Sequence, residues 1–138
     1  MSNSTFSVSP VGEIQSSLKN LTDALRQGSE GAPEAWITIK PAFARAMHRL
    51  EPGDDVVVLT WFHLSDRTVL EVHPRNDTSI PLTGVFATRS PDRPNPIGLH
   101  RVRVLEISEN RLRVAPIEAI DGTPVIDIKP VLDAINDS

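Results

Sequence analysis

The sequence predicts a mainly β domain, either a closed β-barrel or a β-rich α+β domain, with one or two short helices. Short runs rich in Val, Ile and aromatic residues recur along the chain and are separated by turn signals. Only one segment places apolar residues convincingly at helical spacing. Proline is also frequent, with 12 among 138 residues, and proline favours loops and strand ends over the interiors of helices.

Each expected strand is a short run with apolar or alternating character. The run at 56–62 is almost uniformly apolar, which is typical of a buried strand, whereas residues 101–104 and 111–114 alternate Arg with Val or Leu, which is typical of a strand with one buried face. The opening run bends at Pro10. In chain order the expected strands cover residues 6–14, 35–39, 56–62, 68–72, 84–88, 99–107, 111–114 and 124–128.

One helix is expected directly after the second strand. Pro41 suits the first turn of a helix, where its missing N–H would find no partner in any case. Phe43, Met47 and Leu50 recur at spacings that bring them to one face, and the Pro-Gly-Asp turn at 52–54 ends the segment. A second, weaker helix is expected after the last strand.

Composition excludes several classes of protein. The longest apolar run, residues 56–62, is far shorter than the roughly 20 residues of a membrane helix. The first five residues carry neither the basic region nor the apolar core of a signal peptide. The chain contains no Cys, which excludes disulfides, thiolate metal ligands and a cysteine nucleophile. We therefore expect a cytoplasmic protein with a single domain over residues 1–138.

Charge is distributed unevenly along the chain. The formal net charge is -4, which argues against bulk attraction to nucleic acid. Residues 63–103 are the exception, because they hold six basic and four acidic residues. Four arginines crowd the end of this basic stretch: Arg89, Arg93, Arg101 and Arg103. A solvated strand face and a binding patch both fit this pattern.

A proline-stiffened loop lies within the basic stretch. Pro91, Pro94 and Pro96 fall within six residues, and each fixes its own φ and pushes the preceding residue out of the helical region. The loop should therefore present Arg89, Arg93 and Asn95 in an extended, rigid shape. Rigid polar loops between strands are good places for binding sites, and a purely structural turn is the other interpretation.

Familiar catalytic motifs are mostly absent. No Gly-x-Gly occurs, so neither the dinucleotide-binding fingerprint nor a phosphate-binding P-loop is present, and Gly-x-Ser-x-Gly is missing as well. The four His residues, at positions 48, 63, 73 and 100, lack the close spacing of metal ligands, so no metal site is expected.

Three stretches together resemble the TsaA-like family of tRNA methyltransferases. The strongest is residues 84–99, GVFATRSPDRPNPIGL, which is similar to the family signature almost letter for letter. The second is residues 121–130, DGTPVIDIKP. The third is looser and combines Pro10-Val11-Gly12, Arg26-Gln27-Gly28 and Trp61-Phe62-His63. In order and spacing, these stretches cover nearly the whole chain.

The resemblance implies a small β-barrel that binds S-adenosylmethionine without a Rossmann fold and works as a homodimer. It also implies methylation of the N6 nitrogen of N6-threonylcarbamoyladenosine at position 37 of tRNA. Longer family members continue into a C-terminal domain thought to help hold tRNA, and we expect this chain to lack a separate domain of that kind. By position, the cofactor contacts of the family would fall on Arg26, Gln27, Gly28, His63, Leu64, Arg89, Leu99, Ile117 and Glu118.

The implied reaction needs little beyond positioning, because the sulfonium of the cofactor is already a good leaving group. A hydrogen-bond acceptor on the N–H of the adenine amine would help the nitrogen to attack. Asn95 supplies a side-chain carbonyl, and the backbone carbonyls around Pro94 and Pro96 lie beside it. Asn95 is therefore the candidate catalytic residue, and a turn former that satisfies its own loop is the alternative role.

The expected RNA partner is the tRNA anticodon loop, whose unpaired base can be splayed out at low cost. Two other functions fit the same residues. One is a methyltransferase of this fold that acts on a small molecule or a protein, and the other is a non-catalytic module that binds S-adenosylmethionine. If tRNA is the substrate, phosphate contacts are expected from Arg93, Arg101 and Arg103.

Overall fold

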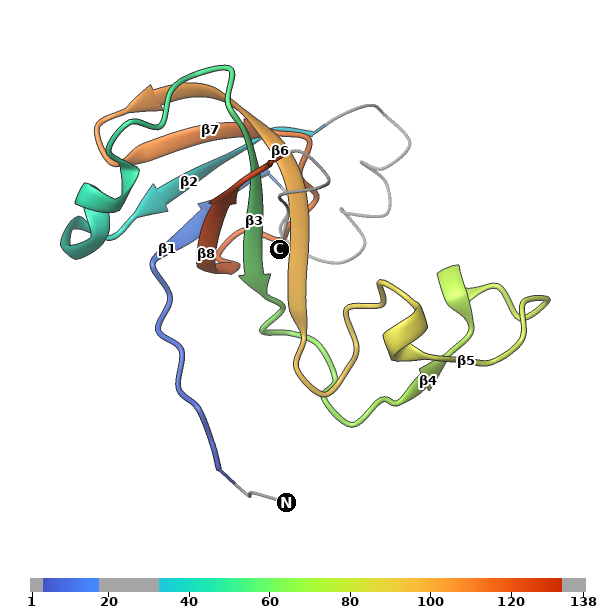
Figure 1. Ribbon diagram of the computed structural model, residues 1–138. Coiled ribbons are helices and arrows are strands. Elements are labelled where there is room, and N and C mark those ends of the chain that lie inside the picture. Colours follow the sequence, from blue (N-terminus) through green and yellow to red (C-terminus); the bar gives the residue numbers. More distant parts are fainter. Residues whose placement is uncertain (1–3, 18–32, 133–138) are drawn as a thin grey trace.

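The computed structural model describes residues 4–17 and 33–132, and within them six strands close into a barrel (Figure 1). In chain order these strands are β1 (Gly12–Gln15), β2 (Ala35–Ile39), β3 (Asp55–Trp61), β6 (Ile97–Ser108), β7 (Arg111–Ala115) and β8 (Pro124–Pro130). Around the barrel they follow the order β1-β2-β7-β6-β3-β8, and every neighbouring pair is antiparallel. The predicted mainly β fold and the barrel that the resemblance implies are both confirmed.

Alternation along the strands fills the barrel with apolar side chains. In β7, Leu112 and Val114 are buried while Arg111 and Arg113, between and before them, are only half-buried on the outer face. Most of the buried residues are β-branched, which suits the pleated surface of a sheet. They form one cluster: Ile14, Ala35, Ile37, Ile39, Val56, Val58, Val102, Val104, Leu112, Val114, Ile117, Ala119 and Val125.

Residues 62–96 leave the barrel between β3 and β6 and form an extension that we call the arm (Figure 1, green to yellow). Among its residues only Val85 and Pro96 are buried. The arm therefore has almost no hydrophobic core of its own. It contains a two-stranded antiparallel sheet and two 3₁₀ helices, in the order β4 (Glu71–Val72), η2 (Pro74–Asn76), β5 (Thr83–Gly84) and η3 (Val85–Ala87).

The helix expected after β2 is a 3₁₀ helix, η1 (Pro41–Met47), and not an amphipathic α-helix. None of its residues is buried, while Met47 and Leu50 pack half-buried against the core. A segment this short is unstable as an isolated helix, and without a buried face nothing favours regular α-helical turns over the tighter 3₁₀ geometry. Among the described residues, no helix has the length and apolar character that a membrane span requires.

Three expected strands are shorter than predicted. In the arm, residues 68–72 contribute only β4, and residues 84–88 turn into η3 after Gly84. A two-stranded sheet has no second layer to pack against, so an apolar pattern alone does not extend it. Near the N-terminus residues 4–10 are exposed, and strand pairing begins only at Gly12. The helix expected after the last strand lies beyond Leu132, outside the described residues.

Candidate functional site

The proline-rich loop, residues 88–97, leads the chain from the arm back to strand β6 of the barrel. β3 ends at Trp61 and β6 begins opposite it at Ile97, so the loop lies where the arm meets the barrel. The Phe62 N–H donates to the Pro96 carbonyl at 2.8 Å and closes this junction. Gly98 permits the close packing beneath it, since a Cβ there would lie 2.4 Å from both the Phe62 ring and Thr60 Oγ1.

Arg93 binds the backbone of its own loop. Its Nε donates to the Ser90 carbonyl at 2.8 Å, and its Nη2 donates to the carbonyls of Thr88, at 2.6 Å, and Val85. These three charge-assisted bonds hold the turn that follows η3. From the sequence we expected Arg93 to contact phosphate, and we did not expect it to bind its own loop. Its role in RNA binding stays a prediction.

Arg67 was not singled out from the sequence, yet it clamps the same loop through two further hydrogen bonds. Its Nε donates to the Pro94 carbonyl at 2.7 Å, and its Nη2 donates to Asn95 Oδ1 at 3.0 Å. The guanidinium also lies over the Trp61 ring, 5.1 Å from the centroid, within the range of a cation–π contact. No local sequence pattern signals this clamp, because the residues it joins lie on different passes of the chain.

The remaining arginines of the basic stretch differ in what they contact. Arg103 forms an ion pair with Asp55, whose oxygen lies 3.0 Å from Nε, and the hydrogen bonds from Arg103 hold the pKa of Asp55 below its usual value. Arg89 and Arg101 are exposed, and neither forms an ion pair within the described part of the chain. Within that part of the chain these two guanidinium groups are therefore available to a ligand, and the charge of Arg101 also helps to lower the pKa of Asp55.

Four of the cofactor residues implied by the resemblance lie on the arm or at its base. His63 and Leu64 are exposed directly after β3, and Arg89 is exposed in the proline-rich loop. Leu99 lies 51% exposed on β6, opposite Leu59 of β3. No hydrogen bond or ion pair joins any two of these four side chains within the part of the chain that the structure describes.

The other implied cofactor residues lie elsewhere. Ile117 belongs to the core, and its N–H donates to the Pro33 carbonyl at 3.0 Å, so of its polar atoms the carbonyl alone is left for a ligand. Glu118, beside it, is exposed. Arg26, Gln27 and Gly28 lie outside the described residues.

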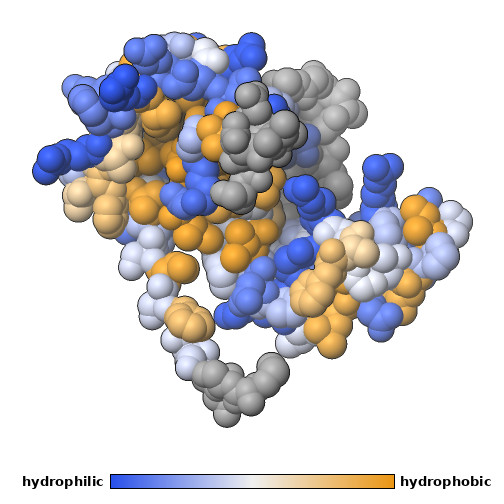
Figure 2. All heavy atoms as spheres, viewed as in Figure 1, coloured by the Kyte–Doolittle hydropathy of each residue, from blue (hydrophilic) through white to orange (hydrophobic). Residues whose placement is uncertain are grey.

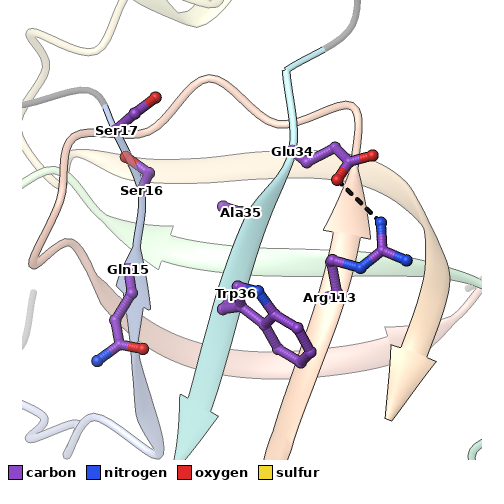
Figure 3. Close-up of a pocket in the computed structure, with 7 residues that line it drawn as sticks. All are labelled: Gln15, Ser16, Ser17, Glu34, Ala35, Trp36 and Arg113. Atoms are coloured by element: carbon purple, nitrogen blue, oxygen red, sulfur yellow. Dashed lines mark hydrogen bonds and ion pairs between the residues drawn. The ribbon is translucent and has the colours of Figure 1, made fainter.

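Two cavities in the barrel wall contain none of the implied cofactor residues. One, of about 590 Å³, lies between η1 and the turn from β6 to β7. The other, of about 390 Å³, is lined by Gln15, Ser16, Ser17, Glu34, Ala35, Trp36 and Arg113 (Figure 3). In that cavity Arg113 binds Glu34 at 2.9 Å and Glu106 at 3.1 Å, so its charge is already compensated.

The arm carries an apolar surface that faces solvent. Four large apolar side chains of the arm are more than half exposed, and Phe86 is 89% exposed. Figure 2 shows apolar residues gathered on this part of the molecule. Large apolar patches exposed to solvent are typical of interaction sites. We call it the arm surface, and it consists of Leu64, Leu70, Leu82 and Phe86.

His100 lies just beneath the junction of arm and barrel. Its Nε2 lies 2.9 Å from the buried Thr60 Oγ1, and its ring forms a T-shaped contact with the Phe62 ring at a centroid distance of 5.8 Å. Burial lowers the pKa of His100 to about 4, so the imidazole is neutral at pH 7. Among the described residues, no three His, Asp or Glu side chains converge in a way that could hold a metal ion.

Residues 13–137 match the family described as the tRNA-methyltransferase O N-terminal domain. A relative in Methanothermobacter thermautotrophicus, a probable S-adenosyl-L-methionine-binding protein, is 43% identical over 136 residues, which is 99% of this chain and 97% of the relative. An S-adenosyl-L-methionine-binding protein of Archaeoglobus fulgidus is 42% identical over 130 residues, 92% of each chain.

Solved structures agree with this match. The crystal structure of TrmO from Pseudomonas aeruginosa has a TM-score of 0.69 at 33% identity and covers 98% of this chain and 61% of that chain. Another TrmO structure has a TM-score of 0.74 at 35% identity, covering 98% and 62%. This chain therefore spans less than two thirds of the length of those solved chains. The chain belongs to the TsaA-like family of tRNA-methyltransferase O N-terminal domains.

Proposed function

We propose that this protein is an S-adenosylmethionine-dependent methyltransferase that methylates N6 of N6-threonylcarbamoyladenosine at position 37 of tRNA. The observation that carries the proposal is the match of residues 13–137 to the tRNA-methyltransferase family. Relatives named for S-adenosylmethionine binding support the cofactor. Because tRNA is modified in the cytoplasm, the proposal includes a cytoplasmic location.

The cofactor site of the proposal is centred on the base of the arm. Arg89 is exposed, forms no ion pair within the described residues, and lies in the turn that Arg93 holds, between Thr88 and Ser90. A guanidinium of this kind can bind the cofactor's carboxylate through two parallel hydrogen bonds. The other proposed contacts are those implied by the resemblance: Arg26, Gln27, Gly28, His63, Leu64, Leu99, Ile117 and Glu118.

The proposal also includes a homodimer that forms through the arm surface. An arm with two buried residues and four exposed large apolar side chains is better stabilised when a second copy covers it. A two-fold interface would bring each arm surface against the other copy. The second copy would also cover those proposed cofactor residues that lie exposed on the arm and on β6 in a single chain.

The tRNA contact of the proposal rests mainly on Arg101. Its side chain is exposed on β6 and forms no ion pair within the described residues. Arg103, two residues along the same face, shares its charge with Asp55. Arg93 contacts backbone carbonyls and offers the phosphates only its remaining donors. We therefore expect Arg101 to contribute most to phosphate binding.

The test is transfer of a labelled methyl group from S-adenosylmethionine to tRNA that carries the threonylcarbamoyl modification. Mass spectrometry of the digested nucleosides should find the modified adenosine one methyl group heavier, and tRNA without the modification is the control. Cofactor binding without transfer to any acceptor would identify a non-catalytic module. Transfer to a protein or small-molecule fraction, with tRNA unmethylated, would replace tRNA as the substrate.

A further inference from the structure

Within the sequence Pro94-Asn95-Pro96, every oxygen that the sequence offered for the substrate amine already accepts one hydrogen bond. The Pro94 carbonyl accepts from Arg67 Nε at 2.7 Å, the Asn95 carbonyl accepts from the Ile97 N–H at 2.7 Å, and the Pro96 carbonyl accepts from the Phe62 N–H at 2.8 Å. Asn95 Oδ1 accepts from Arg67 Nη2 at 3.0 Å. Both oxygens of Asn95 therefore already accept a hydrogen bond, whereas its amide N–H groups have no acceptor within the described residues.

The contact with Arg67 also decides which way the Asn95 amide points. A guanidinium only donates hydrogen bonds, so the atom of Asn95 that faces it must be the oxygen. The amide nitrogen then points away from Arg67, and Asn95 is exposed. Within the described residues no acceptor contacts this nitrogen. Asn95 thus presents two N–H donors at the junction of arm and barrel.

Arg67 is itself held in place. Its guanidinium lies over the Trp61 ring at the end of β3. The neighbouring Asp66 N–H donates to Asp92 Oδ1 at 2.9 Å, which ties the outgoing pass of the arm to the returning loop. Prolines on both sides of Asn95 restrict its backbone as well. The orientation of the amide is therefore built into the fold before any ligand binds.

We propose that Asn95 is a hydrogen-bond donor in the reaction, and that Arg67 is the positioning residue that fixes its orientation. The acceptor on the substrate is the carbonyl oxygen of the substituent on the nitrogen that receives the methyl group. This inference rests on the proposed function and names how that site recognises its substrate.

A donor at this carbonyl helps the nitrogen in a way that an acceptor on its N–H does not. The N6 lone pair is delocalised into the adenine ring and into the carbamoyl carbonyl, and it becomes available as the N6 proton leaves. Negative charge then develops on the carbonyl oxygen, where fixed N–H donors stabilise it. The methyl group moves from sulfur to N6, so the S–C bond breaks, the N–C bond forms, the thioether departs and the proton passes to water.

Asn95→Asp separates the two roles, because it keeps the shape and the oxygen that faces Arg67 while replacing the donor with an acceptor. We expect kcat on modified tRNA to fall by about 100-fold, the scale seen when one such donor is lost. Affinity for S-adenosylmethionine and the melting temperature should stay unchanged. Activity equal to or above that of the unchanged protein would overturn the donor role.

Arg67→Met tests the positioning role. It should lower kcat while leaving the KM for S-adenosylmethionine unchanged, and it should have no further effect on kcat in an Asn95→Ala background. Arg111→Met is the matched control, since Arg111 also lies over a tryptophan ring, Trp36, at 4.3 Å, but on the far strands β2 and β7. Equal losses from Arg67→Met with and without Asn95 would overturn the positioning role.

These experiments distinguish a failure of the donor role from a failure of the proposed function. If the unchanged protein does not methylate modified tRNA, the proposed function fails. If it does so and Asn95→Asp matches it, the proposed function stands and the donor role fails.

Discussion

The barrel buries thirteen apolar side chains in one cluster, whereas the arm buries two residues and exposes four large apolar ones. The barrel is thus held by the hydrophobic effect, which needs no particular partner for each side chain. The arm is held by directed hydrogen bonds from Arg67 and Arg93 to specific oxygens of the arm itself. Stability and the proposed ligand recognition therefore fall on different parts of one small chain.

The largest expected difference is between core and arm truncations. Ile37→Ala removes a fully buried side chain from β2 and should lower the free energy of unfolding by about 2–5 kcal/mol. Leu82→Ala, on the exposed arm surface, should change it by roughly 0.5 kcal/mol or less when measured on the monomer. Denaturant titration of both variants measures the difference. Equal losses would show that the arm shares the core.

Acidification should weaken the barrel at the end where the arm joins it. The folded protein keeps His100 neutral down to a pKa of about 4, whereas the unfolded chain binds that proton near 6.5. Protonation therefore favours the unfolded state in this window, and the free energy of unfolding should fall by about 1.4 kcal/mol per pH unit between these values. His100→Gln should lose this part of the pH dependence, which urea titrations from pH 7 to pH 4 would measure.

Cofactor affinity should depend on the arm. Arg89→Ala removes a guanidinium proposed to bind a carboxylate, which is worth about 1.5–3 kcal/mol, so affinity for S-adenosylmethionine should fall by roughly tenfold or more. Arg75→Ala removes an exposed arginine of the arm that is not part of the proposed site, and it serves as the control. Calorimetric titration distinguishes them, and unchanged affinity in Arg89→Ala would remove Arg89 from the cofactor site.

Self-association should depend on the arm surface. Phe86→Ser exchanges an 89% exposed phenyl ring for a small polar group, and a buried Phe is worth about 1.5–3 kcal/mol. Sedimentation should therefore find the dimer dissociating at concentrations at least about tenfold higher than for the unchanged protein. The melting temperature of the monomer should not change. A protein that sediments as a monomer before any substitution contradicts the proposed dimer.

The smallest expected effect concerns salt. Arg101→Ala should reduce the slope of log affinity for tRNA against log salt concentration by about 0.7, the value for one phosphate contact in a single strand. Cofactor affinity should be unaffected, since Arg101 lies on β6 outside the proposed cofactor contacts. A parallel loss of cofactor affinity would place Arg101 in the cofactor site.

Most barrel strands could be predicted from residue patterns alone. β2 was predicted with its exact bounds, and β3, β6, β7 and β8 differ from their predicted ranges by one or two residues at the ends. Alternation is a reliable signal there because each strand packs one face on a shared core. In the arm the same apolar pattern was misleading, since its side chains face solvent and have no second layer to order them.

The resemblance of residues 84–99 to a family signature predicted where a site would lie, but it did not predict the hydrogen bonds within that loop. Arg93 has the charge of a phosphate ligand and binds three backbone carbonyls instead. Asn95 has an acceptor oxygen that Arg67 occupies. A carbonyl accepts hydrogen bonds whatever the side chain on its residue, so no pattern of residue types could have indicated which arginine reaches it.

The sequence by itself determined the barrel strands, the β-rich composition and the family, because periodicity and local motifs are properties of neighbouring residues. Tertiary structure alone decided the partners of the arginines, the direction of the Asn95 amide and the neutral state of His100. These depend on groups from distant parts of the chain: Arg67 meets Asn95, and His100 meets Thr60, only after β3 and β6 pair. The sequence determines which side chains are charged or can form hydrogen bonds, but the fold determines which atoms they contact.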